Sequence, residues 1–314
     1  MEKISHEFEN HLLNRFGSTV NSEKLPLVFI LGSPRTGSTL VYQFLINTFD
    51  FFYISNFIDK IYANCPLIGA ALDVQLNPRD ALPYVSSYGK TESWFEPSEG
   101  SLVFRNWFGG GHPSEIKSAK VIPDRQDHMK QSLSAIAGLS NRPLLFKNAW
   151  HCFRIPELVR IFSECAFVWI RRDIQASAIS DLEARYRRGS AESWNSASPA
   201  NYHDLLKLPY WEQVVEQQYE YNRTIRLRLS ELCPSRFIEI WYEDLCSTPF
   251  QAENRFVQFF SSTGVKAARR DTDIPNLNRS GGAKIPDQDR ENICGYLKAN
   301  YERFNEYTYD STSA

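Results

Sequence analysis

The sequence predicts an α/β protein in which a parallel sheet is covered by helices on both faces. Four short apolar segments, rich in β-branched and aromatic residues, are each followed by a segment with helical character. Because a strand followed by a helix returns to a parallel neighbour, this alternation predicts parallel strands that are buried on both faces. The 314 residues can bury one large core, and we treat residues 1–314 as a single domain.

The predicted strands and helices alternate along the chain. The strands are expected at 27–31, 144–147, 167–170 and 237–241. The helices that follow them are expected at 38–49, 153–162, 175–187 and 249–261. Ligands of such sheets bind at the carboxyl ends of the strands, so the residues directly after each strand are the first candidates for a site.

Two segments interrupt the alternation. Residues 64–120 hold several aromatic residues and a triple glycine, and we expect a helical, aromatic insertion that shapes a ligand pocket. Residues 189–209, with two prolines, predict a loop that could act as a lid over the site. Core packing of the aromatic residues and a passive connection are the alternatives. The polar tail from Asn305 is expected to fray.

The glycine-rich turn after the first strand, Gly32-Ser33-Pro34-Arg35-Thr36-Gly37-Ser38-Thr39, is the strongest signal in the chain. Backbone N–H groups converge where such a turn opens a helix, and the helix dipole favours an anion there. The glycine spacing is that of a nucleotide-triphosphate loop, but Ser38 stands where those loops carry lysine. The cation lies inside the turn, at Arg35. This arrangement predicts a ligand with fewer charges beyond its 5′-phosphate.

A second anion site is predicted after the strand at 167–170. Arg172 follows this strand, and Ser180 lies eight residues later, about two turns into the next helix. A guanidinium and a hydroxyl can grip one phosphate from two sides. The alternative is a solvated ion pair among Arg171, Arg172 and Asp173.

Together these segments resemble the sulfotransferases that use 3′-phosphoadenosine 5′-phosphosulfate (PAPS). The family's 5′-phosphosulfate loop, P-[KR]-[ST]-G-[ST]-T, matches residues 34–39, and its arginine with a serine eight residues on matches Arg172 and Ser180. Its Y-E-D-L-x-x-x-P segment matches residues 242–249. The resemblance extends over roughly residues 26–285. It is greatest to the bacterial-type members, whose L-K-x-P-x-H segment is similar to residues 146–151.

The resemblance implies a P-loop-NTPase-like sulfotransferase fold that moves a sulfuryl group from PAPS, leaving the bisphosphate PAP, to a hydroxyl or amine of a small-molecule acceptor. Tyr242 is expected to contact the adenine, and Arg279 belongs to a late loop expected over the 3′-phosphate. The implied donor-binding residues are Pro34, Arg35, Thr36, Gly37, Ser38, Thr39, Arg172, Ser180, Tyr242 and Arg279.

Sulfuryl transfer needs a base for the acceptor proton and cations for the charge that develops on the donor's bridging oxygen. Lys147, at a strand end, and Arg35 are the candidate cations. Three residues compete for the role of base. Glu96 ranks first, because its aromatic neighbours could desolvate the carboxylate. His151 ranks second, since the resemblance places a histidine base two residues before it, and Glu99 ranks third.

Two other functions stay open: a P-loop kinase or NTPase, and a noncatalytic PAP-binding module. The net charge of −2 and pI near 6.3 give no basic field for nucleic acid. The apolar runs are too short to span a bilayer, and the N-terminus has no signal-peptide core, so we expect a cytoplasmic location. The six cysteines lack metal-ligand spacing, and no metal is expected. A homodimer stays open.

Overall fold

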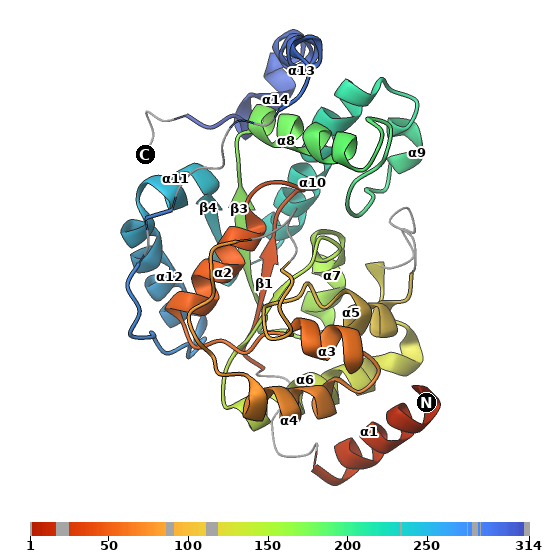
Figure 1. Ribbon diagram of the computed structural model, residues 1–314, viewed down its shortest axis with the longest axis vertical. Coiled ribbons are helices and arrows are strands. Elements are labelled where there is room, and N and C mark those ends of the chain that lie inside the picture. The colour runs from red at the N-terminus through yellow and green to blue at the C-terminus, as the bar shows by residue number, and fades with distance from the viewer. Residues whose placement is uncertain are drawn as a thin grey trace.

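The computed structural model describes residues 2–16, 25–85, 91–110, 119–232, 234–274, 276–277, 282 and 284–310. Four parallel strands form its centre, in the order β2-β1-β3-β4 (Figure 1). Their bounds are β1 (Leu27–Leu31), β2 (Leu144–Lys147), β3 (Ala166–Arg171) and β4 (Phe237–Trp241). The predicted α/β class and all four predicted strands are confirmed, with β3 one residue longer at each end.

Helices cover both faces of this sheet because successive side chains of each strand point to opposite sides. Phe29 of β1 packs in one core, whereas Val28 and Ile30 pack in the other. The first core is closed by α3 (Asn56–Ile61), α4 (Pro66–Leu76), α5 (Ser101–Phe108), α6 (Gln126–Ser140), α7 (His151–Ile161) and α10 (Tyr210–Ser230). The second is closed by α2 (Ser38–Thr48), α11 (Tyr242–Ser247) and α12 (Pro249–Thr263).

A third cluster joins the helices beyond the sheet. It unites α10 with α8 (Ile174–Arg187), α13 (Asp287–Ala299) and α14 (Tyr301–Phe304). The described part of the chain also contains α1 (Glu2–Phe16), α9 (Tyr202–Leu205) and the 3₁₀ turns η4 (Pro123–Arg125), η5 (Pro234–Arg236) and η6 (Asn305–Tyr307). The four predicted helices are confirmed as α2, α7, α8 and α12. Within the described residues, no helix has the length and apolar character needed to cross a membrane.

Three of the aromatic side chains of segment 64–120 are core residues, whereas Trp94 is exposed. Phe104, Trp107 and Phe108 are each at most 2% exposed and pack in the first core. For these three the alternative of core packing is therefore the correct one. Whether the segment as a whole shapes a pocket stays a prediction, and its residues 86–90 and 111–118 lie outside the described part.

Side chains of α10 hold the loop at 189–209 in place. Gln217 Nε2 donates to the Asn195 carbonyl at 2.6 Å, and Tyr221 Oη donates to the Ala197 carbonyl at 2.6 Å. Gln213 Nε2 donates to the Leu208 carbonyl at 2.8 Å. These bonds fasten the described loop along its length, whereas its predicted role as a lid stays a prediction.

A fully buried ion pair lies beneath the same loop. Arg185 Nε donates to Asp181 Oδ2 at 3.3 Å, and both side chains are 0% exposed. The guanidinium also donates to Gln213 Oε1 and Gln217 Oε1, each at 2.9 Å. Asn195 Nδ2 donates to the other Asp181 oxygen at 2.5 Å. The pair thus connects α8, α10 and the loop. The hydrogen bonds satisfy the buried positive charge of Arg185 and the buried negative charge of Asp181.

We expect Arg185→Leu to lower the free energy of unfolding by about 3–5 kcal/mol, because it leaves the Asp181 carboxylate buried without its cation. Arg187→Leu is the matched control on the same helix, since its pair with Glu183 is exposed on the arginine side. It should cost no more than about 1 kcal/mol. Urea unfolding of both variants measures the difference, and equal losses would contradict the role of the buried pair.

Candidate active site

The site lies where the connections after two neighbouring strands leave in opposite directions. The chain after β1 leads to β2 on one side of the sheet, and the chain after β3 leads to β4 on the other. Such a reversal opens a crevice at the carboxyl ends of β1 and β3. The turn at 32–39 and Arg172 follow these two strands, so the fold brings the two predicted anion sites to the same edge of the sheet, where β1 and β3 end (Figure 1).

Both glycines of the turn are needed because neighbouring side chains fill the space where a Cβ would be. At Gly32 a Cβ would lie 2.7 Å from Ile170 Cγ2, at the end of β3. At Gly37 it would lie 2.4 Å from Tyr242 Cδ2, and the residue has φ +86°. Thr36 Oγ1 donates to the Ser33 carbonyl at 2.8 Å, which closes the turn. The turn is thereby pressed against β3 and α11.

The turn has the donors that an anion requires. Gly37, in the left-handed conformation, caps α2 and has no side chain of its own, so the N–H groups at the start of that helix face the crevice. The Ser33 hydroxyl is buried and has no hydrogen-bond partner in the described part of the chain. Ser38 is half-buried and Pro34 is buried, and both lie in this turn. A phosphate-sized anion fits these residues.

Four of the predicted donor-binding residues form one cluster. Arg35 Nε donates to Ser180 Oγ at 3.2 Å, and Arg172 Nη1 donates to the Arg35 carbonyl at 2.8 Å. The Arg172 guanidinium lies 4.6 Å from the centre of the Tyr242 ring. Arg35 thus belongs with Ser180 and Arg172. Tyr242, only 5% exposed, lies between Arg172 and Gly37, a position that supports the turn and leaves little ring for an adenine.

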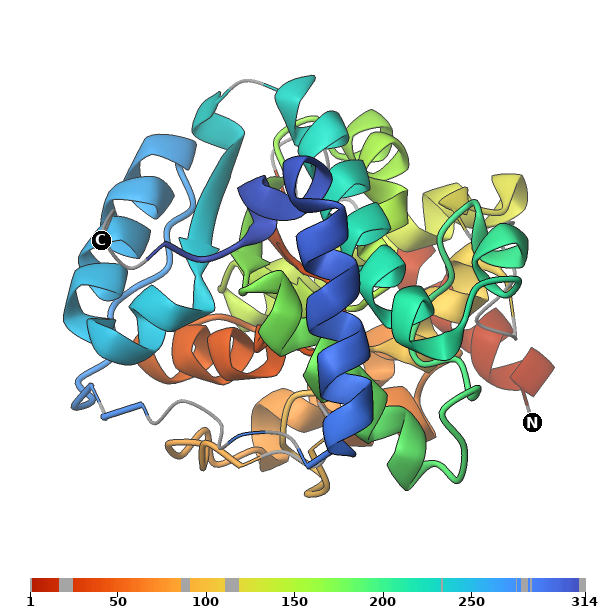
Figure 2. The same ribbon diagram turned by 90° about the horizontal axis from the view of Figure 1, so that it is seen from above.

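The C-terminal segment packs against this side of the crevice. The sequence did not predict this contribution. Figure 2 shows it passing from α14 toward α11. Tyr309 donates its backbone N–H to Asp173 Oδ2 at 3.2 Å and its hydroxyl to Asp244 Oδ1 at 2.6 Å. Asp173 also caps α8 by accepting from the Ala176 N–H at 2.9 Å. The expectation of a frayed tail is therefore wrong for residues 305–310, and no motif in that polar segment signals its contacts.

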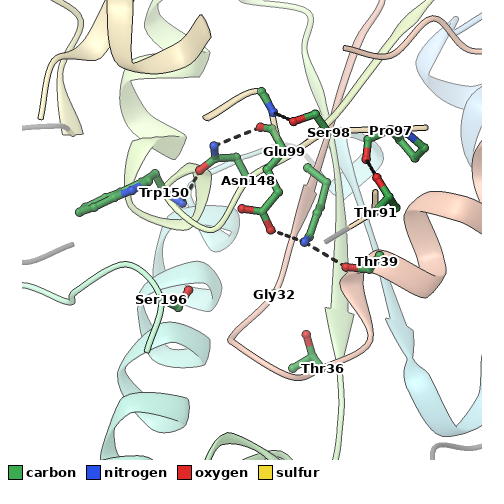
Figure 3. A network of polar contacts seen from close by, with 12 residues as sticks. Gly32, Thr36, Thr39, Thr91, Pro97, Ser98, Glu99, Asn148, Trp150 and Ser196 are labelled. Carbon is green, nitrogen blue, oxygen red and sulfur yellow. Dashed lines mark hydrogen bonds and ion pairs between the residues drawn. The ribbon is translucent and has the colours of Figure 1, made fainter. Parts of the chain in front are cut away.

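Lys147, Glu99 and Thr39 form a second cluster beside the turn. Lys147 Nζ lies 2.5 Å from Glu99 Oε1 and donates to Thr39 Oγ1 at 3.1 Å. The lysine is buried, whereas the Glu99 side chain is 31% exposed and can meet a ligand. Asn148 Nδ2 donates to the Glu99 carbonyl at 3.1 Å, and its Oδ1 accepts from the Trp150 N–H at 2.9 Å. Figure 3 shows these contacts.

The loop that carries Glu99 is held by buried polar side chains. Asn56 Nδ2 donates to Thr91 Oγ1 at 3.0 Å, and Thr91 Oγ1 donates to the Pro97 carbonyl at 2.9 Å. Ser98 Oγ donates to Asp59 Oδ2 at 2.9 Å (Ser98 and Thr91 are labelled in Figure 3). The other Asp59 oxygen accepts N–H bonds from the first turn of α5. These bonds fix the backbone on both sides of Glu99.

Glu96, the first-ranked candidate base, is used in its own loop. Its Oε2 accepts the backbone N–H groups of Glu92 and Ser93, both at 2.9 Å. The neighbouring Trp94 is 54% exposed, and Glu96 itself is half-buried. Among the described contacts Glu96 closes a turn, and the ion pair with Lys147 belongs to Glu99. Which of the two carboxylates acts as base stays a prediction.

His151, the second-ranked candidate, is a core residue. It is 0% exposed, and its ring lies 4.4 Å from that of Phe104 and 5.1 Å from that of Phe29. Neither ring nitrogen has a hydrogen-bond partner among the described residues. Burial, with a smaller effect of Arg154, lowers the pKa of His151 well below its ordinary value. A neutral histidine sealed in the core cannot accept a proton from a ligand.

Two further expectations, the role of Arg279 and the absence of a metal, are not tested by the described residues. Arg279 lies outside the described residues. No group of three or more His, Cys, Asp or Glu residues in the described ranges is placed to hold a metal ion. Four of the cysteines, at 65, 152, 165 and 246, are buried and belong to no disulfide among the described residues, and burial raises the pKa of the Cys152 and Cys165 thiols to about 12.

Comparisons with known proteins establish the family and the fold. A sequence model of the sulfotransferase family matches residues 26–262. No curated protein matches the chain. Among solved structures, sulfotransferase STF9 from Mycobacterium avium is 12% identical, with a TM-score of 0.53, covering 94% of this chain and 72% of that one. Sulfotransferase STF1 from Mycobacterium tuberculosis H37Rv is 13% identical, with a TM-score of 0.51, covering 94% and 80%. These likenesses show the P-loop-like fold.

The burial of His151 predicts a pH-dependent stability. Below about pH 6.5 the unfolded chain binds a proton at this residue and the folded chain does not. The contribution is thus fully present above about pH 6.5 and falls by about 1.4 kcal/mol per pH unit as the pH drops. His151→Leu should remove this part of the slope. Urea unfolding between about pH 7.5 and 5.5 tests it, and identical slopes in variant and wild type would contradict a neutral, buried histidine.

Proposed function

The chain belongs to the sulfotransferase family and is a sulfotransferase, and we propose that it moves a sulfuryl group from PAPS to a hydroxyl or amine of a small-molecule acceptor. The observation that carries the proposal is the Lys147–Glu99 ion pair, which lies against Thr39 of the anion-binding turn. It combines a cation, a carboxylate and a helix N-terminus at one point. The kinase alternative lacks the lysine after Gly37 that a triphosphate requires.

The two clusters match the two ends of this donor. The N–H groups at the start of α2 and the buried Ser33 hydroxyl would bind the 5′-phosphosulfate. Arg172 and Ser180, with Arg35 between them, would bind the 3′-phosphate by charge-assisted hydrogen bonds. Tyr242 would position Arg172 and the turn, since it contacts both. The donor supplies the sulfuryl group, and the chain supplies charge, orientation and a base.

Glu99 is the base in this proposal. Its partly exposed carboxylate accepts the proton of the acceptor hydroxyl or amine while a bond forms between the acceptor atom and sulfur. The bond from sulfur to the bridging oxygen of the donor breaks, and PAP leaves with the charge of that oxygen. Lys147 Nζ, next to both Glu99 and Thr39, offsets that charge. Asn148 positions Glu99 through its backbone carbonyl.

We expect Glu99→Gln to lower turnover by ~10²–10⁴ while the fold and PAP binding persist, because the amide cannot accept the proton. Glu96→Gln is the matched control, three residues away in the same loop, and should stay near wild-type turnover. The assay incubates PAPS with a panel of alcohols, phenols and amines and detects products by mass. Loss of turnover in Glu96→Gln, with Glu99→Gln active, would return the base to Glu96.

Arg172→Ala should weaken PAP binding by about 2–3 kcal/mol, on the order of 30- to 150-fold, because it removes a charged donor to the 3′-phosphate. Ser180→Ala should act in the same direction with a smaller effect. Arg188→Ala, exposed at the far end of α8, is the control and should leave binding unchanged. Titration calorimetry with PAP measures all three. Unchanged affinity in folded Arg172→Ala would remove the 3′-phosphate from this cluster.

A further inference from the structure

We propose that the body of the acceptor lies in a groove between α7 and α10, and that the acceptor is an elongated, mainly apolar alcohol or phenol; this inference rests on the proposed function. The groove has a volume of about 310 Å³, within the range of sites for small molecules. Trp150, Phe153 and Pro156 line one wall, and Thr224 and Leu227 of α10 line the other.

One rim of the groove is hydrogen-bonded to the catalytic loop. Trp150 donates its N–H to Asn148, and Asn148 donates to the backbone of Glu99. The loop after α8 borders both regions, since Ser198 lines the groove and Ser196 lies two residues earlier. Trp150 and Ser196 both lie to one side of Glu99 in Figure 3. The groove and the catalytic loop are thus linked through Asn148 and Trp150.

The spacing of the wall residues sets the shape of the ligand. Trp150, Phe153 and Pro156 follow one another at intervals of three, so they lie on one face of α7 and extend over roughly 9 Å of helix axis. Residues 147 and 150 are three positions apart, so Lys147 and Trp150 lie within about 11 Å of each other. An elongated molecule with its hydroxyl at Glu99 would extend along this wall.

The side chains that line the groove indicate the polarity of the ligand. Two aromatic rings, a proline and a leucine supply apolar surface, which a hydrocarbon body would bury favourably. The wall carboxylate, Glu220, is engaged by Arg223 Nη2 at 2.7 Å. Ser198 Oγ and Asn201 Oδ1 are buried and have no partner in the described part of the chain. These two atoms fit an acceptor with a hydrogen-bonding group along its body.

The test measures binding of phenol, 4-butylphenol and 4-octylphenol to the enzyme by calorimetry, with and without PAP. Affinity should rise by about fourfold for each methylene that enters the groove. Thr224→Trp should fill the groove and abolish this rise, whereas Thr224→Ser, at the same position, should retain it. Leu227→Glu, at a side chain that is 51% exposed, should weaken 4-octylphenol most and spare phenol.

The outcomes of this test separate the proposed acceptor groove from the proposed donor. Affinity that does not depend on chain length in the wild type, or that survives in folded Thr224→Trp and Leu227→Glu, would overturn the groove. Failure to bind PAP would instead contradict the proposed donor, and the alkylphenol series without PAP keeps the two failures apart. Sulfation of 4-octylphenol with a lower KM than phenol, and loss of that advantage in Thr224→Trp, would support both.

Discussion

The close approach of the glycine turn to Ile170 and Tyr242 is the constraint on which the rest of the site depends. A Cβ at Gly32 or Gly37 would collide with one of these side chains, so the turn can lie flat on the end of β3. That contact brings Arg35 within reach of Ser180 on α8 and its carbonyl within reach of Arg172. The two predicted anion sites, which are more than a hundred residues apart in the sequence, thus lie side by side.

The charged side chains of this crevice lie on segments that buried polar side chains hold in place. Asp59 and Asn56 fix the loop of Glu99, and Asp173 is fixed by the C-terminal Tyr309. Buried polar groups of this kind cost free energy unless they are hydrogen-bonded, and here the bonds connect the loop of Glu99 with α3 and the start of α8 with the C-terminal segment. The ion pair of Lys147 and Glu99 depends on this framework, because neither residue lies on an element that alone would face the other.

Helix α10 shows why part of the fold was not evident from the sequence. Its inward face includes Gln213 and Gln217, which bind the buried Arg185 and the loop at 189–209. Because these polar residues share the buried face with Val214 and Ile225, the apolar stripe is interrupted and periodicity gives a weaker signal for this helix. The loop that it holds resembled a mobile connection, because its composition does not reveal the bonds that fasten it.

The sequence by itself determined the four strands, the helices that follow them, the anion-binding turn and the pair Arg172 and Ser180, since each is encoded by local spacing and apolar runs. Only the tertiary structure placed one of the three candidate bases, Glu99, beside Lys147. Glu99 and Lys147 are 48 residues apart, and their contact depends on the path of a loop set by distant partners. The tertiary structure also buries His151 in the core and packs the C-terminal segment against α8 and α11. Long-range packing decides such features, because no short segment contains both partners.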